Sequence, residues 1–175
     1  MSARLAKQTI GDPSDENVRM GALATHLQVD RVKENVNILM QEQDIVYGDM
    51  DNFNVVGADK NKGAFFSPLL FRNNDPHNKV KVHETECFGP VSTLMPYKDL
   101  DDAVKLARMG KGSLVSSIIT ADDKIATDYV VNAASMHGRI LVLNERCAKE
   151  STGHGSPMPL MTHGGPGRAG GGEEM

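Results

Sequence analysis

The stretch Leu114-Val115-Ser116-Ser117-Ile118-Ile119 decides the fold of this chain. It is short, rich in branched residues and nearly unbroken in apolar character, as expected of a strand whose faces are covered by helices. A second stretch of this kind, Ile140-Leu141-Val142-Leu143, follows a helical pattern at residues 122–135. The spacing therefore predicts two parallel strands joined by a helix.

The same alternation continues toward the N-terminus. A strand is predicted over residues 91–97 and a helix over 100–109, which gives β-α-β-α-β for residues 91–144. Asp99 is placed to cap the first of these helices, and Thr120 the second. The prediction is an α/β fold with an open, mainly parallel sheet and helices on both faces.

Residues 1–72 add further elements. An amphipathic helix is predicted over residues 26–42, because its apolar residues recur at helical spacing: Val29, Val32, Val36, Leu39 and Met40. Short strands are predicted at residues 45–47 and 65–71. Because proline cannot donate a ladder hydrogen bond, Pro68 favours an edge or irregular position for the second strand.

Composition excludes several classes of function. The 175 residues carry a formal net charge of -4 without a basic stripe, which argues against a nucleic-acid partner. No apolar run approaches the ~20 residues that span a bilayer, and residues 1–7 lack the apolar core of a signal peptide. Two cysteines without CxxC spacing indicate free thiols in a reducing compartment. A soluble cytoplasmic protein without a membrane partner is expected.

The tail offers two weak motifs. Gly165-Pro166-Gly167-Arg168-Ala169-Gly170 matches GxGxxG, but it lacks the strand-and-helix context of a dinucleotide-binding site, so an ordinary Gly-rich loop is favoured. The six histidines show no metal-ligand spacing, and no metal is predicted. His154 and His163 either line a pocket or face solvent.

Cys147 is the one candidate nucleophile that the residues suggest. Arg146 and Lys149 are cationic neighbours, which would lower the pKa of its thiol. No activating base can be named from the sequence, and no G-x-S-x-G elbow supports a serine triad in its place.

The segment Glu84-Thr85-Glu86-Cys87-Phe88-Gly89-Pro90-Val91 carries the strongest functional signal. A carboxylate at Glu86 can accept hydrogen bonds from two ribose hydroxyls, and a ring two residues later lies on the same side of an extended segment, where it can pack against a nicotinamide. The alternative is an acidic turn that enters a strand, with Phe88 in the core.

Several stretches in order along the chain together resemble the aldehyde dehydrogenase family. They are Gly11-Asp12-Pro13, Met20-Gly21-Ala22-Leu23, Gly63-Ala64-Phe65-Phe66-Ser67-Pro68, Glu86-Cys87-Phe88-Gly89-Pro90-Val91 and Gly138-Arg139-Ile140-Leu141-Val142-Leu143-Asn144. The loop 145–157 and the Gly-rich segment 163–172 further resemble the semialdehyde dehydrogenase half of the bifunctional ring-opening enzymes of bacterial phenylacetate catabolism. The resemblance extends over essentially the whole chain.

This resemblance implies specific roles. Glu86 would bind the nicotinamide ribose and Phe88 the nicotinamide of NADP or NAD, while the loop at 145–158, with Arg146, Cys147 and His154, would line the substrate pocket. It implies an α/β catalytic domain, partial here, at residues 1–144 and a Gly/Pro-rich substrate-loop tail at 145–175. The complete enzyme would oxidise a small or CoA-linked aldehyde as a homo-oligomer without a metal.

The resemblance also implies that the catalytic residues lie elsewhere. The family's nucleophilic cysteine and glutamate base would lie upstream of Met1, so no catalytic residue is assigned and the chain alone is predicted to be inactive. One alternative is a non-catalytic α/β module, either a pseudoenzyme or an interaction domain that pairs through exposed sheet edges. Another is that the chain is a piece of a longer protein.

Overall fold

The computed structural model describes residues 1–151 and 164–170. The chain divides into two compact units, residues 1–96 and residues 97–175. The boundary predicted near residue 144 lies inside the second unit, just after the strand His137–Leu143.

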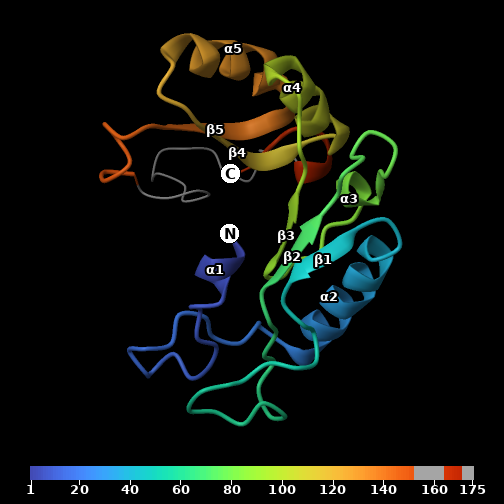
Figure 1. The fold of residues 1–175 in the computed structure, drawn as a ribbon, viewed down its shortest axis with the longest axis vertical. Coiled ribbons are helices and arrows are strands. Elements are labelled where there is room, and N and C mark those ends of the chain that lie inside the picture. Colours follow the sequence, from blue (N-terminus) through green and yellow to red (C-terminus); the bar gives the residue numbers. More distant parts are fainter. Residues whose placement is uncertain (152–163, 171–175) are drawn as a thin grey trace. The chain divides into compact units, whose positions relative to one another are not determined.

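The first unit contains a three-stranded sheet and one long helix (Figure 1). Strand β2 lies between β1 and β3, antiparallel to β1 and parallel to β3. In chain order the elements are α1 (Ser2–Leu5), α2 (His26–Leu39), β1 (Asp44–Tyr47), β2 (Leu69–Arg72), α3 (Lys81–Glu84) and β3 (Val91–Leu94).

The core of the first unit forms where α2 packs on this sheet. Most of the predicted apolar stripe of α2 is buried there, with Val32 and Val36 fully inside and Leu39 nearly so. Met40, predicted on the same stripe, caps the end of the helix and is 47% exposed. The helix pattern was therefore correct as far as Leu39, where the helix ends.

Pro68 predicted an edge or an irregular strand: the edge position is wrong, whereas the pairing of this strand with β1 is irregular, because its register shifts between Ile45 and Tyr47. The strand begins one residue later, at Leu69, and β2 is the central strand of the sheet. Because Pro68 precedes the ladder, its missing N–H removes no strand hydrogen bond. The residues that follow it, Leu69 to Phe71, are accordingly almost completely buried.

The second unit is built on two parallel strands, β4 and β5, connected by α5. Helices α4 and α5 pack together on the sheet through Val104, Tyr129 and Ala133, with Ile118 and Ile140 beneath them, so both helices cover the same face (Figure 1). The elements are α4 (Leu100–Met109), β4 (Ser113–Ile119), α5 (Asp123–Ala133), the 3₁₀ turn η1 (Ala134–Met136), β5 (His137–Leu143) and the 3₁₀ turn η2 (Gly167–Ala169).

One of the two predicted helix caps is confirmed. Asp99 accepts a hydrogen bond from the Asp102 amide at 2.8 Å and begins α4. Thr120 is not the cap of α5, because Asp122 accepts the bonds from the first-turn amides while Thr120 accepts one from Asp122. The aspartate lies closer to the helix and its carboxylate reaches two amides, so it displaces the threonine from this role.

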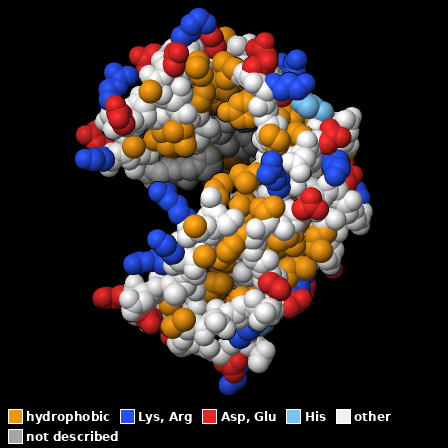
Figure 2. Space-filling model, viewed as in Figure 1, with side chains coloured by type: hydrophobic (Ala, Val, Ile, Leu, Met, Phe, Trp, Pro, Cys, Tyr) orange, Lys and Arg blue, Asp and Glu red, His pale blue; other side chains and the backbone are white. Residues whose placement is uncertain are grey.

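The predicted α/β class is confirmed, and two of the three strand pairings are parallel. The described strands are distributed over two sheets, because β3 pairs with β2 and β4 pairs with β5. Both units carry acidic and basic side chains on the face shown in Figure 2. In the described ranges, no helix is long and apolar enough to cross a membrane.

Candidate functional site: an exposed carboxylate and ring on a fixed loop

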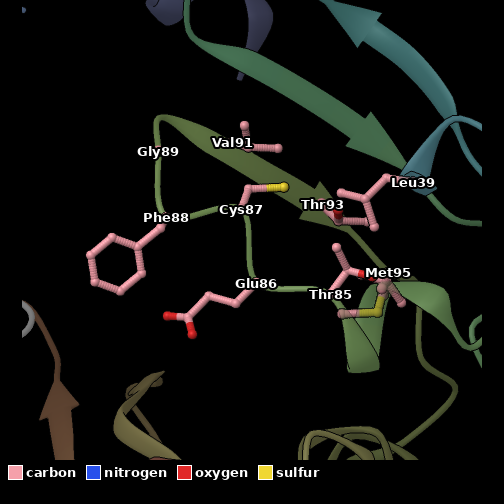
Figure 3. Close-up of a pocket in the computed structure, with 10 residues that line it drawn as sticks. Leu39, Thr85, Glu86, Cys87, Phe88, Gly89, Val91, Thr93 and Met95 are labelled. Carbon is pink, nitrogen blue, oxygen red and sulfur yellow. The ribbon is translucent and has the colours of Figure 1, made fainter. Parts of the chain in front are cut away.

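The candidate cofactor site is the loop 85–90, which joins α3 to β3. Glu86 and Phe88 project to the same side of this loop, while Cys87 points the opposite way, toward Leu39, Val91 and Thr93 (Figure 3). Both Glu86 and Phe88 are exposed, Phe88 by 74%. The exposure of Phe88 rules out the alternative in which its ring belongs to the core.

A surface cavity of about 400 Å³ adjoins this loop. Its walls are both polar and apolar, as needed for a ligand with a sugar and a ring. The lining residues include Leu39, Val82, Glu86, Cys87, Phe88 and Val91. An exposed carboxylate accepts hydroxyl hydrogen bonds, and an exposed ring offers a flat apolar face, so these residues fit a nicotinamide ribose.

Two amide side chains of α2 hold the backbone of the loop. Asn35 donates a hydrogen bond from Nδ2 to the carbonyl oxygen of Glu86 at 2.9 Å. Gln28 donates from Nε2 to the carbonyl oxygen of Phe88 at 2.7 Å. Neither residue was predicted from the sequence, although Thr25-x-x-Gln28 is a capping-box pattern that marks Gln28. The Thr25 hydroxyl does accept a hydrogen bond from the Gln28 amide.

Gly89 brings the loop into direct contact with the same helix. A Cβ atom built on Gly89 would lie 2.7 Å from Cγ2 of Val32, a distance that real Cβ contacts do not reach. Val32 is fully buried in the core of the first unit. Only glycine therefore allows the loop to approach the helix closely enough for the two amide hydrogen bonds.

The thiol of Cys87 is not suited to act as a nucleophile. Burial, with a smaller contribution from the negative charge of Glu86, raises the pKa of this thiol to about 11. Since the thiolate is the nucleophile, Cys87 is protonated and unreactive at neutral pH. It packs against the apolar core of the first unit.

Arg146, one of the two cationic neighbours predicted for Cys147, contacts an acidic side chain. The guanidinium of Arg146 contacts the carboxylate of Asp123 at 3.2 Å, an ion pair between exposed side chains. The Cys147 sulfur interacts with the backbone at the end of β5, including the Asn144 amide at 3.4 Å. The two predicted pocket residues thus lie side by side in the chain but make separate contacts.

A second cavity, of about 490 Å³, lies in the second unit where β4 and β5 end. In parallel sheets ligands bind at the carboxyl ends of the strands, which is where this cavity opens. Its lining is mostly apolar: Ile119, Thr120, Ala121, Leu143, Asn144, Glu145 and Ala148. Cys147 lines a neighbouring cavity of about 330 Å³. The third predicted pocket residue, His154, lies outside the described residues.

The GxGxxG match at 165–170 is a docked loop. The amide of Arg168 donates to the carbonyl of Lys111 at 3.1 Å. A Cβ built on Gly112 would lie 1.9 Å from the carbonyl oxygen of Pro166. The loop thus uses its backbone to pack on the start of β4, which supports the ordinary Gly-rich interpretation over a phosphate cradle.

A serine and a histidine connect the starts of β4 and β5. The Ser113 hydroxyl and the His137 Nδ1 atom are 2.6 Å apart. Burial lowers the pKa of His137, because it disfavours the charged ring. Within residues 1–151 and 164–170, the His137 Nε2 atom has no hydrogen-bond partner, and no cluster of three or more His, Cys, Asp or Glu side chains could hold a metal ion.

The structure defines an α/β chain, and comparison with known proteins identifies its family. The model of the aldehyde dehydrogenase family matches residues 1–173. The chain therefore belongs to the aldehyde dehydrogenase family, as its ordered motifs had predicted.

Two relatives are similar over most of the chain. It is 46% identical over 157 residues to Protein MaoC of Klebsiella aerogenes, a match that covers 89% of this chain and 45% of that protein. It is 39% identical over 166 residues to the 3,4-dehydroadipyl-CoA semialdehyde dehydrogenase of Aromatoleum evansii, covering 95% of this chain and 32% of that enzyme. The chain thus spans less than half the length of either relative.

Solved structures share the fold. A betaine aldehyde dehydrogenase from Staphylococcus aureus, solved in complex with NAD+, superposes with a TM-score of 0.79 at 19% identity, over 96% of this chain and 30% of that one. The HpcC protein of Thermus thermophilus superposes with a TM-score of 0.70 at 22% identity, over 81% of this chain and 27% of that one. At these identities the likeness establishes the fold alone.

Proposed function

We propose that this chain supplies the nicotinamide side of the cofactor site in an NAD(P)-dependent aldehyde dehydrogenase. The observation that carries the proposal is the pair formed by Glu86 and Phe88, both exposed on one side of a loop whose backbone is fixed to α2. Family membership and the NAD+ bound to the betaine aldehyde dehydrogenase structure support it. NAD and NADP are both candidate cofactors.

Each residue has a defined task in this proposal. The Glu86 carboxylate accepts hydrogen bonds from the ribose hydroxyls, and the Phe88 ring covers one face of the nicotinamide and excludes water from it. A nicotinamide held there would supply the hydride acceptor for oxidation of the aldehyde. Holding the ribose and ring in one orientation lowers the entropic part of the barrier to that oxidation.

The proposed substrate is a CoA-linked semialdehyde, oxidised to the corresponding acid. Support comes from the relative named 3,4-dehydroadipyl-CoA semialdehyde dehydrogenase, which matches 95% of this chain. The apolar cavity at the ends of β4 and β5, together with the loop that carries Arg146 and Cys147, is the proposed substrate pocket. Arg146, exposed at the loop, is suited to an anionic group of such a substrate. We also propose a homo-oligomer, as is frequent in the family.

The chain by itself is proposed not to turn over aldehyde. The cysteines support this proposal: the Cys87 thiol has a pKa of about 11, and the contacts of the Cys147 sulfur within residues 1–151 and 164–170 are with backbone groups. Activation of a nucleophilic thiol requires an adjacent base or a lowered pKa. The proposed contribution of this chain is therefore binding and orientation.

The test is calorimetry of the purified chain with NAD and with NADP. Glu86→Ala removes a charged acceptor, and hydrogen bonds of this kind contribute about 1.5–3 kcal/mol, so the Kd is expected to rise roughly 10- to 100-fold. Glu34→Ala removes an exposed carboxylate from α2 and is the matched control, with an unchanged Kd expected. No aldehyde-dependent reduction of either dinucleotide is expected with any of these proteins.

Two results would contradict the proposal. One is tight dinucleotide binding that Glu86→Ala leaves unchanged, which would place the cofactor elsewhere. The other is no binding by the parent chain together with self-association that increases with concentration, which would favour an interaction module that pairs through sheet edges.

A further inference from the structure

The carbonyl groups of Glu86 and Phe88 are both bound by one face of one helix. Asn35 follows Gln28 by seven residues, close to two helical turns, so the two amide side chains point in nearly the same direction. They reach the two carbonyls at 2.9 Å and 2.7 Å respectively. The helix thus binds the loop backbone at the two residues whose side chains form the candidate site.

Gln28 is itself held at both ends of its amide. Its Oε1 atom accepts a hydrogen bond from the Ala24 amide at 3.1 Å, while its Nε2 atom donates to the Phe88 carbonyl. The Thr25 cap fixes the first turn of α2 from which Gln28 projects. The donor that meets Phe88 is therefore fixed in place, which reduces the side-chain entropy lost on forming the contact.

Phe88 requires such support because its backbone is strained. Its φ angle is +53°, in the left-handed region that costs a residue with a Cβ atom about 1–2 kcal/mol. Its ring is 74% exposed and so gains little from packing. A strained residue persists only where its surroundings hold it, and the Gln28 hydrogen bond and the Gly89 contact with Val32 are the restraints on either side of the peptide.

From these contacts we propose that Gln28 and Asn35 are positioning residues of the cofactor site. Their amides fix the peptide groups of Phe88 and Glu86, and thereby set the directions in which the ring and the carboxylate point. The inference rests on the proposed function, since it assigns those directions to cofactor binding. It predicts that removal of either amide donor weakens dinucleotide binding, although the Phe88 ring and the Glu86 carboxylate are both still present.

The experiment uses two isosteric substitutions that remove a donor. Gln28→Glu keeps the acceptor for the Ala24 amide and places an acid in the first turn of α2, where it suits the helix dipole, but it turns an oxygen toward the Phe88 carbonyl. Asn35→Asp likewise replaces the donor with an oxygen, here at the Glu86 carbonyl. Asn37→Asp, at an exposed position of the same helix, is the control for the added charge.

The first readout does not depend on the cofactor. The chain contains no tryptophan, so Phe88→Trp introduces a single tryptophan at the strained position, whose fluorescence can be excited apart from that of the three tyrosines. In that background Gln28→Glu is expected to lower the fluorescence anisotropy of this tryptophan, because its peptide loses a restraint, while Asn37→Asp leaves it unchanged. Circular dichroism melting establishes that each variant is folded.

The second readout is the Kd for NAD and NADP in the chain with Phe88 intact. Each donor removal is expected to raise the Kd roughly 3- to 10-fold, the fold-change that one hydrogen bond of ordinary strength gives. Asn35→Gln keeps an amide donor on a longer side chain and is expected to recover most of the loss. Should Gln28→Glu fail to fold, Asn35→Asp and Asn35→Ser carry the same test.

The possible outcomes separate this inference from the proposed function. If Glu86→Ala weakens binding but Gln28→Glu and Asn35→Asp change neither anisotropy nor Kd, the positioning role is wrong and the cofactor site stands. If the parent chain binds no dinucleotide, the proposed function fails, and the role in cofactor binding fails with it, even where the anisotropy falls. A lower anisotropy with a raised Kd is the result that the inference expects.

Discussion

Two loops of this chain, residues 85–90 and residues 164–170, use glycine in opposite ways. In the first loop one glycine, Gly89, contacts α2 and leaves the neighbouring carboxylate and ring exposed. In the second loop the backbone packs on backbone, since a Cβ on Gly138 would lie 1.8 Å from the carbonyl oxygen of Gly164. The first loop exposes side chains, whereas the second packs its backbone against the backbone of the second unit.

The residues with positive φ angles sharpen the contrast. The second loop places Gly167 and Gly170 in these conformations, at φ angles of +57° and +81°, where glycine is unstrained. The first loop places Phe88 there, at +53°. Such strain is frequent at functional sites, and of the two loops the one with the family signature carries it.

Gly112→Ala is expected to lower the stability of the fold most, because the new side chain fills the space that the second loop occupies. Gly112 has a φ angle of +119°, and the new Cβ would lie 1.9 Å from the Pro166 carbonyl oxygen. Strain and displacement together are expected to reduce the free energy of unfolding by about 3 kcal/mol or more, measured by urea denaturation.

Gly110→Ala is the matched control for this substitution. Gly110 lies two residues earlier, has an ordinary helical φ angle of -68° and would place a Cβ 3.8 Å from its nearest neighbour. Its stability is expected to match or slightly exceed that of the parent chain. Equal effects at Gly110 and Gly112 would show that the second loop is not docked on β4.

Gly89→Ala, in the first loop, is expected to lower the stability of the fold by an intermediate amount. The new Cβ would meet the Val32 side chain rather than backbone, so the helix and loop can separate slightly, and overpacking of this kind costs about 1–3 kcal/mol. The same displacement should weaken dinucleotide binding, because it pulls the carbonyls away from Gln28 and Asn35. Both changes are measurable by urea denaturation and calorimetry.

Two further variants check that the effect arises at this contact. Gly21→Ala places a Cβ 4.0 Å from its nearest neighbour, Pro13, and is expected to be mild. In the Val32→Ala background the added penalty of Gly89→Ala should shrink, since the clashing methyl groups are gone. If the two substitutions add without coupling, the close approach of loop and helix is wrong.

Much of this architecture could be predicted because local patterns and tertiary packing agree. The apolar runs at β4 and β5 and the capping aspartate at Asp99 specify their elements directly. The edge position predicted from Pro68 was wrong because proline constrains only the ladder that it joins, and the strand begins after it. Thr120 was misjudged because a better acceptor, Asp122, lies two residues closer to the helix.

The two side chains of the candidate site could be predicted from the sequence, but the residues that hold the backbone of its loop could not. Glu86 and Phe88 belong to a contiguous motif, so the sequence indicates them together. Gln28 and Asn35 act across 60 and 51 residues of chain, through backbone carbonyls that carry no side-chain identity. No local pattern reveals such a contact, and only the packing of α2 against the loop brings the groups together.

Phe88→Gly is expected to have the smallest effect on stability and the most informative sign. Glycine removes the left-handed strain, loses little packing from a ring that is 74% exposed, and adds flexibility to the unfolded chain. The balance is expected to stabilise the fold by about 0.5–1 kcal/mol while dinucleotide binding weakens. Tyr97→Gly is the control: Tyr97 is 63% exposed and has no positive φ angle, so the same change should destabilise. If both variants lose stability equally, Phe88 carries no strain, and the contrast between the two loops reduces to a difference in exposure.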